Sequence, residues 1–190
     1  MAGWSILAGY LAGSVPFAFL LARRKGIDVR QAGSGNVGAA NVLRTTGVGR
    51  AVAVMALDVA KGAAAVAIVH TSNGGVGIAA LTGAAAIVGH IYPVWLRFHG
   101  GKGIAVAAGV FGVLSPIATA IAVGLFVVTV WTTRYISLGS VAATLALPPA
   151  AWLTGSPGTV VGTAAGTAGL ILFRHRANLR RLSSGTERKL

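Results

Sequence analysis

Acidic side chains are scarce in this chain of 190 residues, which contains only Asp28, Asp58 and Glu187. So few carboxylates exclude a carboxylate-based metal site and the paired acids of glycosidase chemistry. Cysteine is absent, which excludes disulfides, thiolate metal ligands and cysteine nucleophiles. We therefore expect no metal and no cofactor, and the general bases that remain as candidates are His90 and His175.

Charged residues make up only 10% of the chain, whereas hydrophobic residues make up 55%. Soluble domains average about 25% charged residues, so this composition indicates a membrane protein. The apolar runs do not alternate with a period of two, and helices are the other structure that satisfies its own backbone in lipid. We predict an all-α, polytopic helical bundle that forms a single domain over residues 1–190.

The apolar runs predict seven transmembrane segments, with five as the strict minimum. Five runs are clear, at 4–22, 51–70, 76–95, 136–154 and 158–173. A further stretch, 103–131, is broken at "LSP" (114–116). Its first piece, 103–114, is shorter than the roughly 17 residues that a span usually needs, so it is either a thin span or half of a re-entrant hairpin.

Positive charge is unevenly divided between the two sides that these segments define. Of the 16 Lys and Arg residues, all but Lys61 lie in or beside 23–50, 96–102, 132–135 and the tail from Arg174. The connections "TSNGG", "LSP" and "TGSPG" carry none. The positive-inside rule therefore places the N-terminus outside and the C-terminus in the cytoplasm. The same rule explains most of the net charge of +13, so we expect no nucleic-acid partner.

The stretch "GSGNVGAANVLR" (33–44) is a glycine-rich loop on the predicted cytoplasmic side. Its three glycines allow positive φ, and successive N–H groups in such a loop can form an anion nest. Its serine and first asparagine are neutral donors, and its arginine is a fork that matches phosphate oxygens. The alternative is a flexible turn that caps a helix through one of the two asparagines. The candidate ligands here are Ser34, Gly35, Asn36 and Arg44.

A second glycine-rich basic stretch, "HGGKG" (99–103), lies on the same side. Lys102 stands at the expected start of an apolar helix, where the helix dipole favours anions. The alternative is an ordinary interfacial lysine on a flexible turn. Upstream, we interpret His90 as a hydrogen-bonded packing residue, because no partner histidine lies at metal-ligand spacing.

The stretch "RHRANLRRL" (174–182) follows the last apolar run. On a helix, His175 and Asn178 share one face, and Arg176 and Arg180 form a pair four residues apart. The alternative is a basic amphipathic tail that rests on anionic lipid.

Polar residues also occur within the predicted spans. In "RYISLGS" (134–140), Ser137 is the expected N-cap, and Ser140 lies one turn inside the helix, where it either lines a cavity or packs. Asp58 and Lys61 lie three residues apart inside the second span, where unpaired charges are costly. We expect a structural ion pair, and the alternative is a proton or ion path.

These stretches together resemble the bacterial acyl-phosphate:glycerol-3-phosphate acyltransferases, integral-membrane enzymes that begin phospholipid synthesis. The strings "GSVPFAFLLARRKGIDVR", "GSGNVGAANVLRTTG" and "GHIYPVWLRFHGGKGIA" are similar to three long motifs of that family, and "LDVAKG", "RYISLGS" and "HRANLRRLSSGTE" fall where it has similar text. The chain departs from the usual Thr, Phe and Lys of the family at Ala40, Trp95 and His99. Ala40 lacks a hydroxyl, so we assign it no role.

The resemblance implies a seven-helix protein of the bacterial inner membrane, with its active site facing the cytoplasm. It implies transfer of a fatty acyl group from acyl phosphate to the 1-hydroxyl of glycerol 3-phosphate, which gives lysophosphatidic acid and inorganic phosphate. We expect these two substrates and membrane lipid as partners, and a monomer. The motif match implies that the phosphates are held by Ser34, Arg44, Lys102, Ser140, His175 and Asn178, and that Asn36 and the Gly100–Gly101 turn shape the site.

Acyl phosphate is already activated, so the transfer needs no covalent acyl-enzyme. The protein has to place the hydroxyl near the carbonyl and neutralise phosphate charge. The proton acceptor is either His175 or a phosphate oxygen of the substrate. Acyltransferases that use acyl-CoA carry H-x-x-x-x-D, and no histidine in this chain has an aspartate five places on.

Two other classes of protein fit the same residues. An anion transporter could use the cationic loops as a mouth and the charges at positions 58 and 61 as a midplane site. A non-catalytic scaffold could bind anionic lipid. The absence of an internal repeat and the position of the glycine-rich motifs at one membrane edge favour the enzyme.

Overall fold

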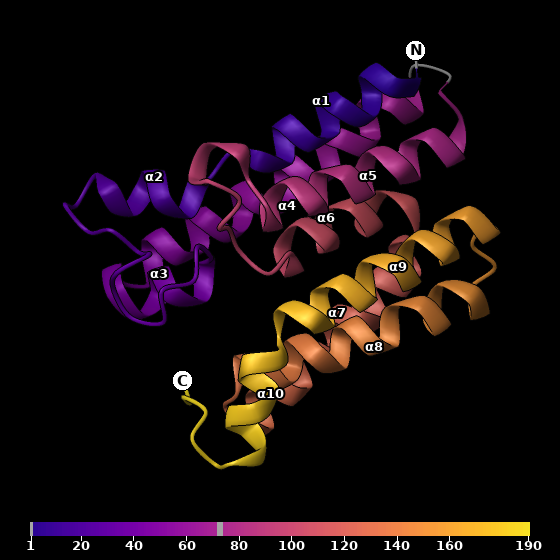
Figure 1. Cartoon of the computed structure of the whole chain (residues 1–190). Coiled ribbons are helices and arrows are strands. Elements are labelled where there is room, and N and C mark those ends of the chain that lie inside the picture. Colours follow the sequence, from indigo (N-terminus) through magenta and orange to yellow (C-terminus); the bar gives the residue numbers. More distant parts are fainter. Residues whose placement is uncertain (1, 72–73) are drawn as a thin grey trace. The chain divides into compact units, whose positions relative to one another are not determined.

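The computed structural model describes residues 2–71 and 74–190, and helices are the only regular elements within these ranges (Figure 1). They are α1 (Ala2–Ser14), α2 (Phe17–Arg23), α3 (Ala39–Thr46), α4 (Val48–Thr71), α5 (Gly75–Ile91), the 3₁₀ turn η1 (Val94–Leu96), α6 (Ile104–Leu114), α7 (Pro116–Thr133), α8 (Ile136–Leu153), α9 (Gly158–Arg174) and α10 (Arg176–Ser183). The chain divides into two compact units, unit 1 (residues 1–110) and unit 2 (residues 111–190), with the boundary inside α6. The predicted all-helical class is confirmed.

Most of these helices are apolar enough for a lipid environment. Five stretches are also long enough to cross a membrane: Ala2–Arg23, Val48–Thr71, Gly75–Leu96, Pro116–Thr133 and Ile136–Leu153. Two shorter apolar helices are Ile104–Leu114 and Gly158–Arg174. The 11 residues of α6 extend about 16 Å at 1.5 Å per residue, roughly half of a hydrocarbon core of about 30 Å.

In unit 1, α1 and α5 approach so closely that their backbones touch. A Cβ atom at Gly13 would collide with the backbone of Ala86, and one at Gly89 would collide with the carbonyl of Tyr10. Gly9, one turn before Gly13, faces α5 in the same way. Helices in lipid gain little from the hydrophobic effect, so close packing of small residues is a main source of their association.

The helices α4 and α6 meet through the same device. A Cβ atom at Gly62 of α4 would collide with the carbonyl of Val106, and one at Gly109 of α6 would collide with the carbonyl of Val59. Each helix therefore contributes one glycine, and the backbone of the other helix packs directly against it.

The first apolar run, 4–22, is two helices and not one. α1 ends at Ser14 and α2 begins at Phe17. Pro16 lies between them, and proline has no N–H to donate to the preceding turn. The break exposes the carbonyl of Val15, which accepts a hydrogen bond of 2.9 Å from the Lys61 ammonium of α4.

Unit 2 consists of α7, α8 and α9 packed in chain order, with α10 contacting α8 and α9. α7 and α8 approach closely at Gly139, where a Cβ atom would lie 2.9 Å from the carbonyl oxygen of Phe126. Gly162 and Gly166 on α9 differ, because a Cβ atom at either would meet no other atom within 4 Å in the described chain. Another helix therefore does not approach α9 closely at these two glycines within the described chain.

In unit 2, connections that the sequence analysis placed on the same side of the membrane lie close to one another. Ser115 Oγ, in the "LSP" turn, lies 2.8 Å from Ser156 Oγ, in the "TGSPG" turn. At the opposite ends of the helices, the N–H of Leu190 donates to the carbonyl of Arg134 over 2.8 Å. The third uncharged connection, "TSNGG", includes residues 72–73, which lie outside the described ranges.

Replacing Gly13 by Ala tests the contact between α1 and α5. The new Cβ would collide with the Ala86 backbone, which cannot move aside as a side chain can. We expect a loss of stability of about 1–3 kcal/mol, typical of overpacking, seen as a lower unfolding temperature in detergent. Gly77→Ala on α5 is the matched control, because its Cβ would meet nothing within 4 Å. Equal unfolding temperatures for the two variants would contradict the backbone contact.

Candidate functional site

The first glycine-rich stretch is half loop and half helix. Residues 39–46 form α3, whereas the glycine-rich sequence predicts a loop over 33–44. Gly33 and Gly35 have positive φ values of 63° and 72°, a conformation that glycine adopts without strain. Gly38 instead is extended, with φ −161°, and it is the N-cap of α3. Neither asparagine caps the helix, so that alternative is wrong.

Asn41, in the first turn of α3, holds the loop together from inside. Its side chain is buried, and its Nδ2 donates to the carbonyls of Val29 (2.9 Å) and Ala32 (3.0 Å). Its Oδ1 accepts the N–H of Ser34 at 2.8 Å. Asn41 therefore makes the three hydrogen bonds that shape the loop, a role that the sequence reading missed.

These bonds change how the loop can bind an anion. The N–H of Ser34 is used by Asn41, that of Gly35 donates to Ala32, and that of Gly38 donates to Asn36. The expected nest of exposed N–H groups is therefore wrong for these three positions. The side chains of the stretch that can bind an anion are placed as follows: Ser34 and Arg44 are exposed, and Asn36 is half-buried.

The loop before this stretch is fixed by an ion pair of its own. Arg30 lies 2.6 Å from the Asp28 carboxylate, which also accepts the backbone N–H of Arg30 at 3.0 Å. The side-chain hydrogen bond from Arg30 lowers the pKa of Asp28 to about 2. The guanidinium of Arg30 also lies over the ring of Phe19, 4.8 Å from its centre. Arg30 is thus engaged in structure, and the candidate cation of this region is Arg44.

The second glycine-rich stretch folds back onto the end of α5. The N–H of Gly100 donates to the carbonyl of Ile91, and that of Gly101 donates to the carbonyl of His90, both over 3.1 Å. A Cβ atom on Gly100 would collide with the His90 carbonyl, and one on Gly101 would collide with Nε2 of the His90 ring. Lys102 follows directly and is half-buried, two residues before the start of α6.

The two glycine-rich stretches lie against each other. A Cβ atom on Gly101 would also lie 2.7 Å from the carbonyl oxygen of Val37. The loop that carries Ser34 and the loop that carries Lys102 therefore touch at their backbones. Unit 1 brings together two of the motifs that the sequence singled out.

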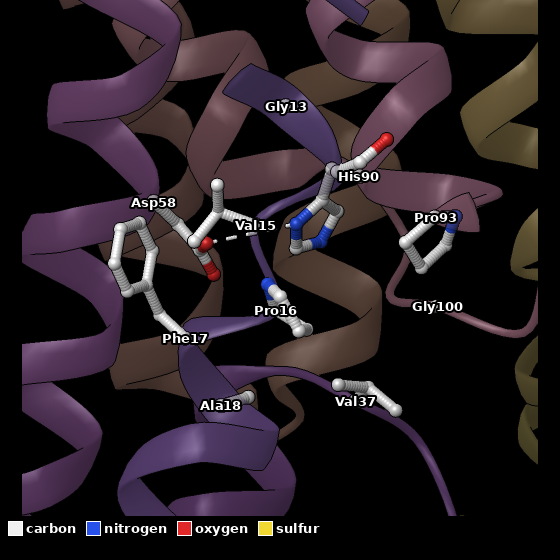
Figure 2. A pocket seen from close by; sticks show the side chains of 11 residues that line it. Gly13, Val15, Pro16, Phe17, Ala18, Val37, Asp58, His90, Pro93 and Gly100 are labelled. Atoms are coloured by element: carbon white, nitrogen blue, oxygen red, sulfur yellow. Dashed lines mark ion pairs between the residues drawn. The ribbon is translucent and has the colours of Figure 1, made fainter. Parts of the chain in front are cut away.

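A small hollow lies beside this contact, and Figure 2 shows the residues that line it. Its wall includes Val37, Gly100 and the chain break between α1 and α2, and Asp58 and His90 reach it with polar atoms. The Nδ1 atom of His90 lies 3.6 Å from Asp58 Oδ1, and Lys61 Nζ lies 2.8 Å from the same oxygen. The charged residues of α4 thus lie beside the second glycine-rich loop.

The remaining candidate residues lie in unit 2. His175 links α9 to α10, and its Nδ1 lies 2.8 Å from the carbonyl oxygen of Ile171. His175 and Asn178 are buried, whereas Arg176 and Arg180 are exposed. This is the division into two faces that helical spacing indicates.

The serines at the start of α8 differ from expectation. The helix begins at Ile136 with Tyr135 as the N-cap, so Ser137 is inside the helix and is not its cap. Ser140 is buried and donates its hydroxyl to the carbonyl of Ile136 over 2.9 Å. To donate to a phosphate instead, the Ser140 hydroxyl has to rotate away from its own helix.

Glu187, which the sequence reading left without a role, binds two of the residues around it. Asn178 Nδ2 donates to Glu187 Oε1 over 2.7 Å, and Arg181 Nε donates to Oε2 over 2.6 Å. Burial alone would raise the pKa of Glu187, but interactions with the surrounding side chains, of which the hydrogen bond from Asn178 is the largest, outweigh it and lower the pKa below its ordinary value. The carboxylate orients the Asn178 amide.

Comparison with known proteins gives one family. The family model described as "Glycerol-3-phosphate acyltransferase" matches residues 3–185. The chain is 45% identical over 185 residues to the glycerol-3-phosphate acyltransferase of Geotalea daltonii, covering 96% of this chain and 94% of the relative. It is 44% identical over 186 residues to that of Rhizobium meliloti, with 97% and 90% covered.

Solved structures agree with the sequence comparison. The chain is similar to the crystal structure of PlsY (YgiH), an integral membrane glycerol 3-phosphate acyltransferase, in its glycerol 3-phosphate form, with a TM-score of 0.96. The identity is 37%, and the match covers 100% of this chain and 95% of the other. The lysophosphatidic acid form of PlsY gives a TM-score of 0.93 with the same identity and coverage.

The role of Asn41 is tested by Asn41→Asp, which keeps Oδ1 but replaces the amide donor by a second oxygen. That oxygen would face the carbonyls of Val29 and Ala32. We expect a loss of about 1–3 kcal/mol, the cost of unpaired buried polar groups, measured by thermal unfolding in detergent. The control is Thr46→Val, because the Thr46 hydroxyl bonds only within its own helix, to Val42. An unfolding temperature for Asn41→Asp equal to that of the control would refute the role.

Proposed function

Because the chain belongs to the glycerol-3-phosphate acyltransferase family, we propose that it transfers a fatty acyl group from acyl phosphate to the 1-hydroxyl of glycerol 3-phosphate. The products of this transfer are lysophosphatidic acid and inorganic phosphate. The observation that carries the proposal is the backbone contact of the two glycine-rich loops in unit 1, which places the segment before Lys102 against the loop that leads to Arg44.

Unit 1 supplies one set of phosphate ligands in this proposal. Arg44 offers a guanidinium fork, Lys102 offers an ammonium group, and Ser34 offers a hydroxyl. Gly35 and Asn36 shape the first loop, and Gly100 and Gly101 shape the second. Because the N–H groups of Ser34 and Gly35 are used within the loop, Ser34 contributes its hydroxyl and not its backbone.

Unit 2 supplies Ser140, His175 and Asn178 as further polar ligands. The hydrogen bond of His175 Nδ1 to the Ile171 carbonyl sets the state of this ring. A carbonyl oxygen only accepts, so Nδ1 carries the hydrogen and, in the neutral ring, Nε2 carries the lone pair. Nε2 is therefore the atom of His175 that takes the proton of the substrate hydroxyl, unless a phosphate oxygen of the substrate takes it.

The proposed reaction passes through no acyl-enzyme. Phosphate is a good leaving group, so direct attack by the glycerol 3-phosphate hydroxyl on the acyl carbonyl requires positioning and charge neutralisation rather than a nucleophilic side chain. The hydroxyl oxygen forms the new ester bond, the carbonyl–phosphate bond breaks, and the hydroxyl proton passes to the acceptor. The chain has no cysteine to serve as a nucleophile.

We also propose seven membrane segments in the bacterial inner membrane, with the N-terminus outside and the site facing the cytoplasm. The five long apolar stretches and two shorter apolar helices support the segment count. The distribution of Lys and Arg supports the orientation. The active form is a monomer in this proposal.

Replacing Arg44 by Ala tests the proposed phosphate site. A hydrogen bond to a charged group contributes about 1.5–3 kcal/mol, so we expect acyl transfer to fall by about 10- to 100-fold. The assay uses purified protein in detergent with acyl phosphate and glycerol 3-phosphate, without coenzyme A, and measures lysophosphatidic acid. In detergent there is no compartment across which a transporter could act.

Arg50→Ala is the matched control, because Arg50 lies near the start of α4 and its guanidinium donates to the carbonyl of Thr46 at 3.4 Å. Activity equal to wild type in Arg44→Ala would exclude Arg44 from the site. Transfer by the wild type from acyl-CoA but not from acyl phosphate would show that the proposed donor is wrong.

A further inference from the structure

Three charged or titratable side chains meet inside unit 1 at the level of the second glycine-rich loop. Asp58 and Lys61 come from α4 and His90 comes from the last turn of α5, and all three are buried. Lys61 Nζ lies 2.8 Å from Asp58 Oδ1 and 3.1 Å from His90 Nδ1. The carbonyl of Val15, at the break between α1 and α2, accepts from the same ammonium at 2.9 Å.

The hydrogen-bonding capacity of Lys61 fixes the state of His90. An ammonium group has three N–H donors and no acceptor. Its three neighbours are the carboxylate of Asp58, the carbonyl of Val15 and Nδ1 of His90. Nδ1 must therefore accept, and the hydrogen of the neutral ring lies on Nε2. A doubly protonated ring would direct an N–H at the ammonium.

The ring of His90 is also the surface on which the glycine-rich loop rests. A Cβ atom on Gly101 would collide with His90 Nε2, and the N–H of Gly101 donates to the His90 carbonyl over 3.1 Å. The residue that follows Gly101 is Lys102. Lys61 thus fixes the orientation of the His90 ring at Nδ1. The other ring nitrogen, Nε2, lies against Gly101, the residue before Lys102.

We propose that His90, held by Asp58 and Lys61, is a positioning residue that sets the place of Lys102 through Gly101. This inference rests on the proposed function, because it takes Lys102 as a phosphate ligand. The proposal gives the ion pair of Asp58 and Lys61 a function in the site, beyond its contribution to the packing of α4. His90 does not serve as the proton acceptor, because its Nδ1 already accepts from Lys61 and its Nε2 carries the hydrogen.

Two substitutions separate the two nitrogens of His90. In His90→Asn, the amide oxygen replaces Nδ1 as the acceptor for Lys61, but no atom fills the position of Nε2 against Gly101. In His90→Gln, the amide reaches the position of Nε2, but the acceptor for Lys61 is lost. His70→Asn is the matched control, because His70 is exposed in the last turn of α4.

For His90→Asn we expect a KM for glycerol 3-phosphate that rises by up to about 100-fold, the effect of a displacement of about 1 Å in a site, with little change in unfolding temperature. For His90→Gln we expect KM to return toward wild type and the unfolding temperature to fall. A purely structural role predicts the opposite pattern, a lower kcat at unchanged KM that follows the loss of stability. That pattern, or a KM equal to the His70→Asn control, would overturn the proposal.

A second measurement follows the loop directly and separates the two proposals. The chain has no cysteine, so His99→Cys creates a single site for a nitroxide label three residues before Lys102. We expect the label to become more mobile in His90→Asn and to stay ordered in His90→Gln. An unchanged spectrum in His90→Asn refutes the positioning role, whatever Lys102 does. Full activity of Lys102→Ala, with a mobile label in His90→Asn, refutes Lys102 as a ligand and leaves the hold of His90 on the loop established.

Discussion

Direct contact between backbones is the constraint on which unit 1 depends. Gly13 lets α1 touch α5, Gly62 and Gly109 let α4 touch α6, and Gly101 lets a loop touch both α5 and the loop at Val37. At each position a side chain would occupy the place of a backbone atom of the partner. A membrane protein gains little from hydrophobic burial between helices, so such contacts provide dispersion energy and geometric precision together. The positions of the candidate loops are fixed in turn, because the loops are attached to helices whose separation is set by main-chain atoms.

Several long helices could be predicted from the sequence because they follow from long apolar runs and from Pro and Gly signals, although the run 4–22 proved to be two helices. The run 51–70, for example, became α4 (Val48–Thr71), and the break at "LSP" became the boundary between α6 and α7. The roles of Asn41 and Glu187 could not be predicted, because each depends on partners that the fold brings close: Asn41 reaches 12 residues back to Val29, and Glu187 reaches 9 residues back to Asn178. Helix α3 was not expected because it has only 8 residues and follows a glycine-rich segment, which favours a loop. The pairing of Asp58 with Lys61 was expected from their spacing, but the participation of His90 joins α4 to α5 and has no signal in the sequence.

The three carboxylates of the chain share one property. Asp28 lies 2.6 Å from Arg30, Asp58 lies 2.8 Å from Lys61, and Glu187 lies 2.6 Å from Arg181. Each acid is therefore matched by a base of its own unit, and each pair orders a segment next to a candidate ligand: the loop before Ser34, the ring under Gly101, and the amide of Asn178. No unmatched carboxylate is therefore found among the three acids. This pairing, and the scarcity of acids in the sequence, suit the two anionic substrates that we propose.

In the first glycine-rich loop, several backbone N–H groups bond within the loop and are not available to a phosphate. In glycine-rich loops that bind phosphate as a nest, the backbone supplies the donors and the geometry is fixed by φ and ψ. In the first loop of this chain, the N–H groups of Ser34, Gly35 and Gly38 instead hold the loop itself. The glycines serve shape and close approach, and in the proposed site the donors to phosphate include side chains carried on this frame. The recognition that we propose for Arg44 and Lys102 is Coulombic, so we expect it to weaken with ionic strength where the groups are exposed. It also depends on how firmly each cation is held, and in our proposal the buried His90 ring provides this hold for the Lys102 loop.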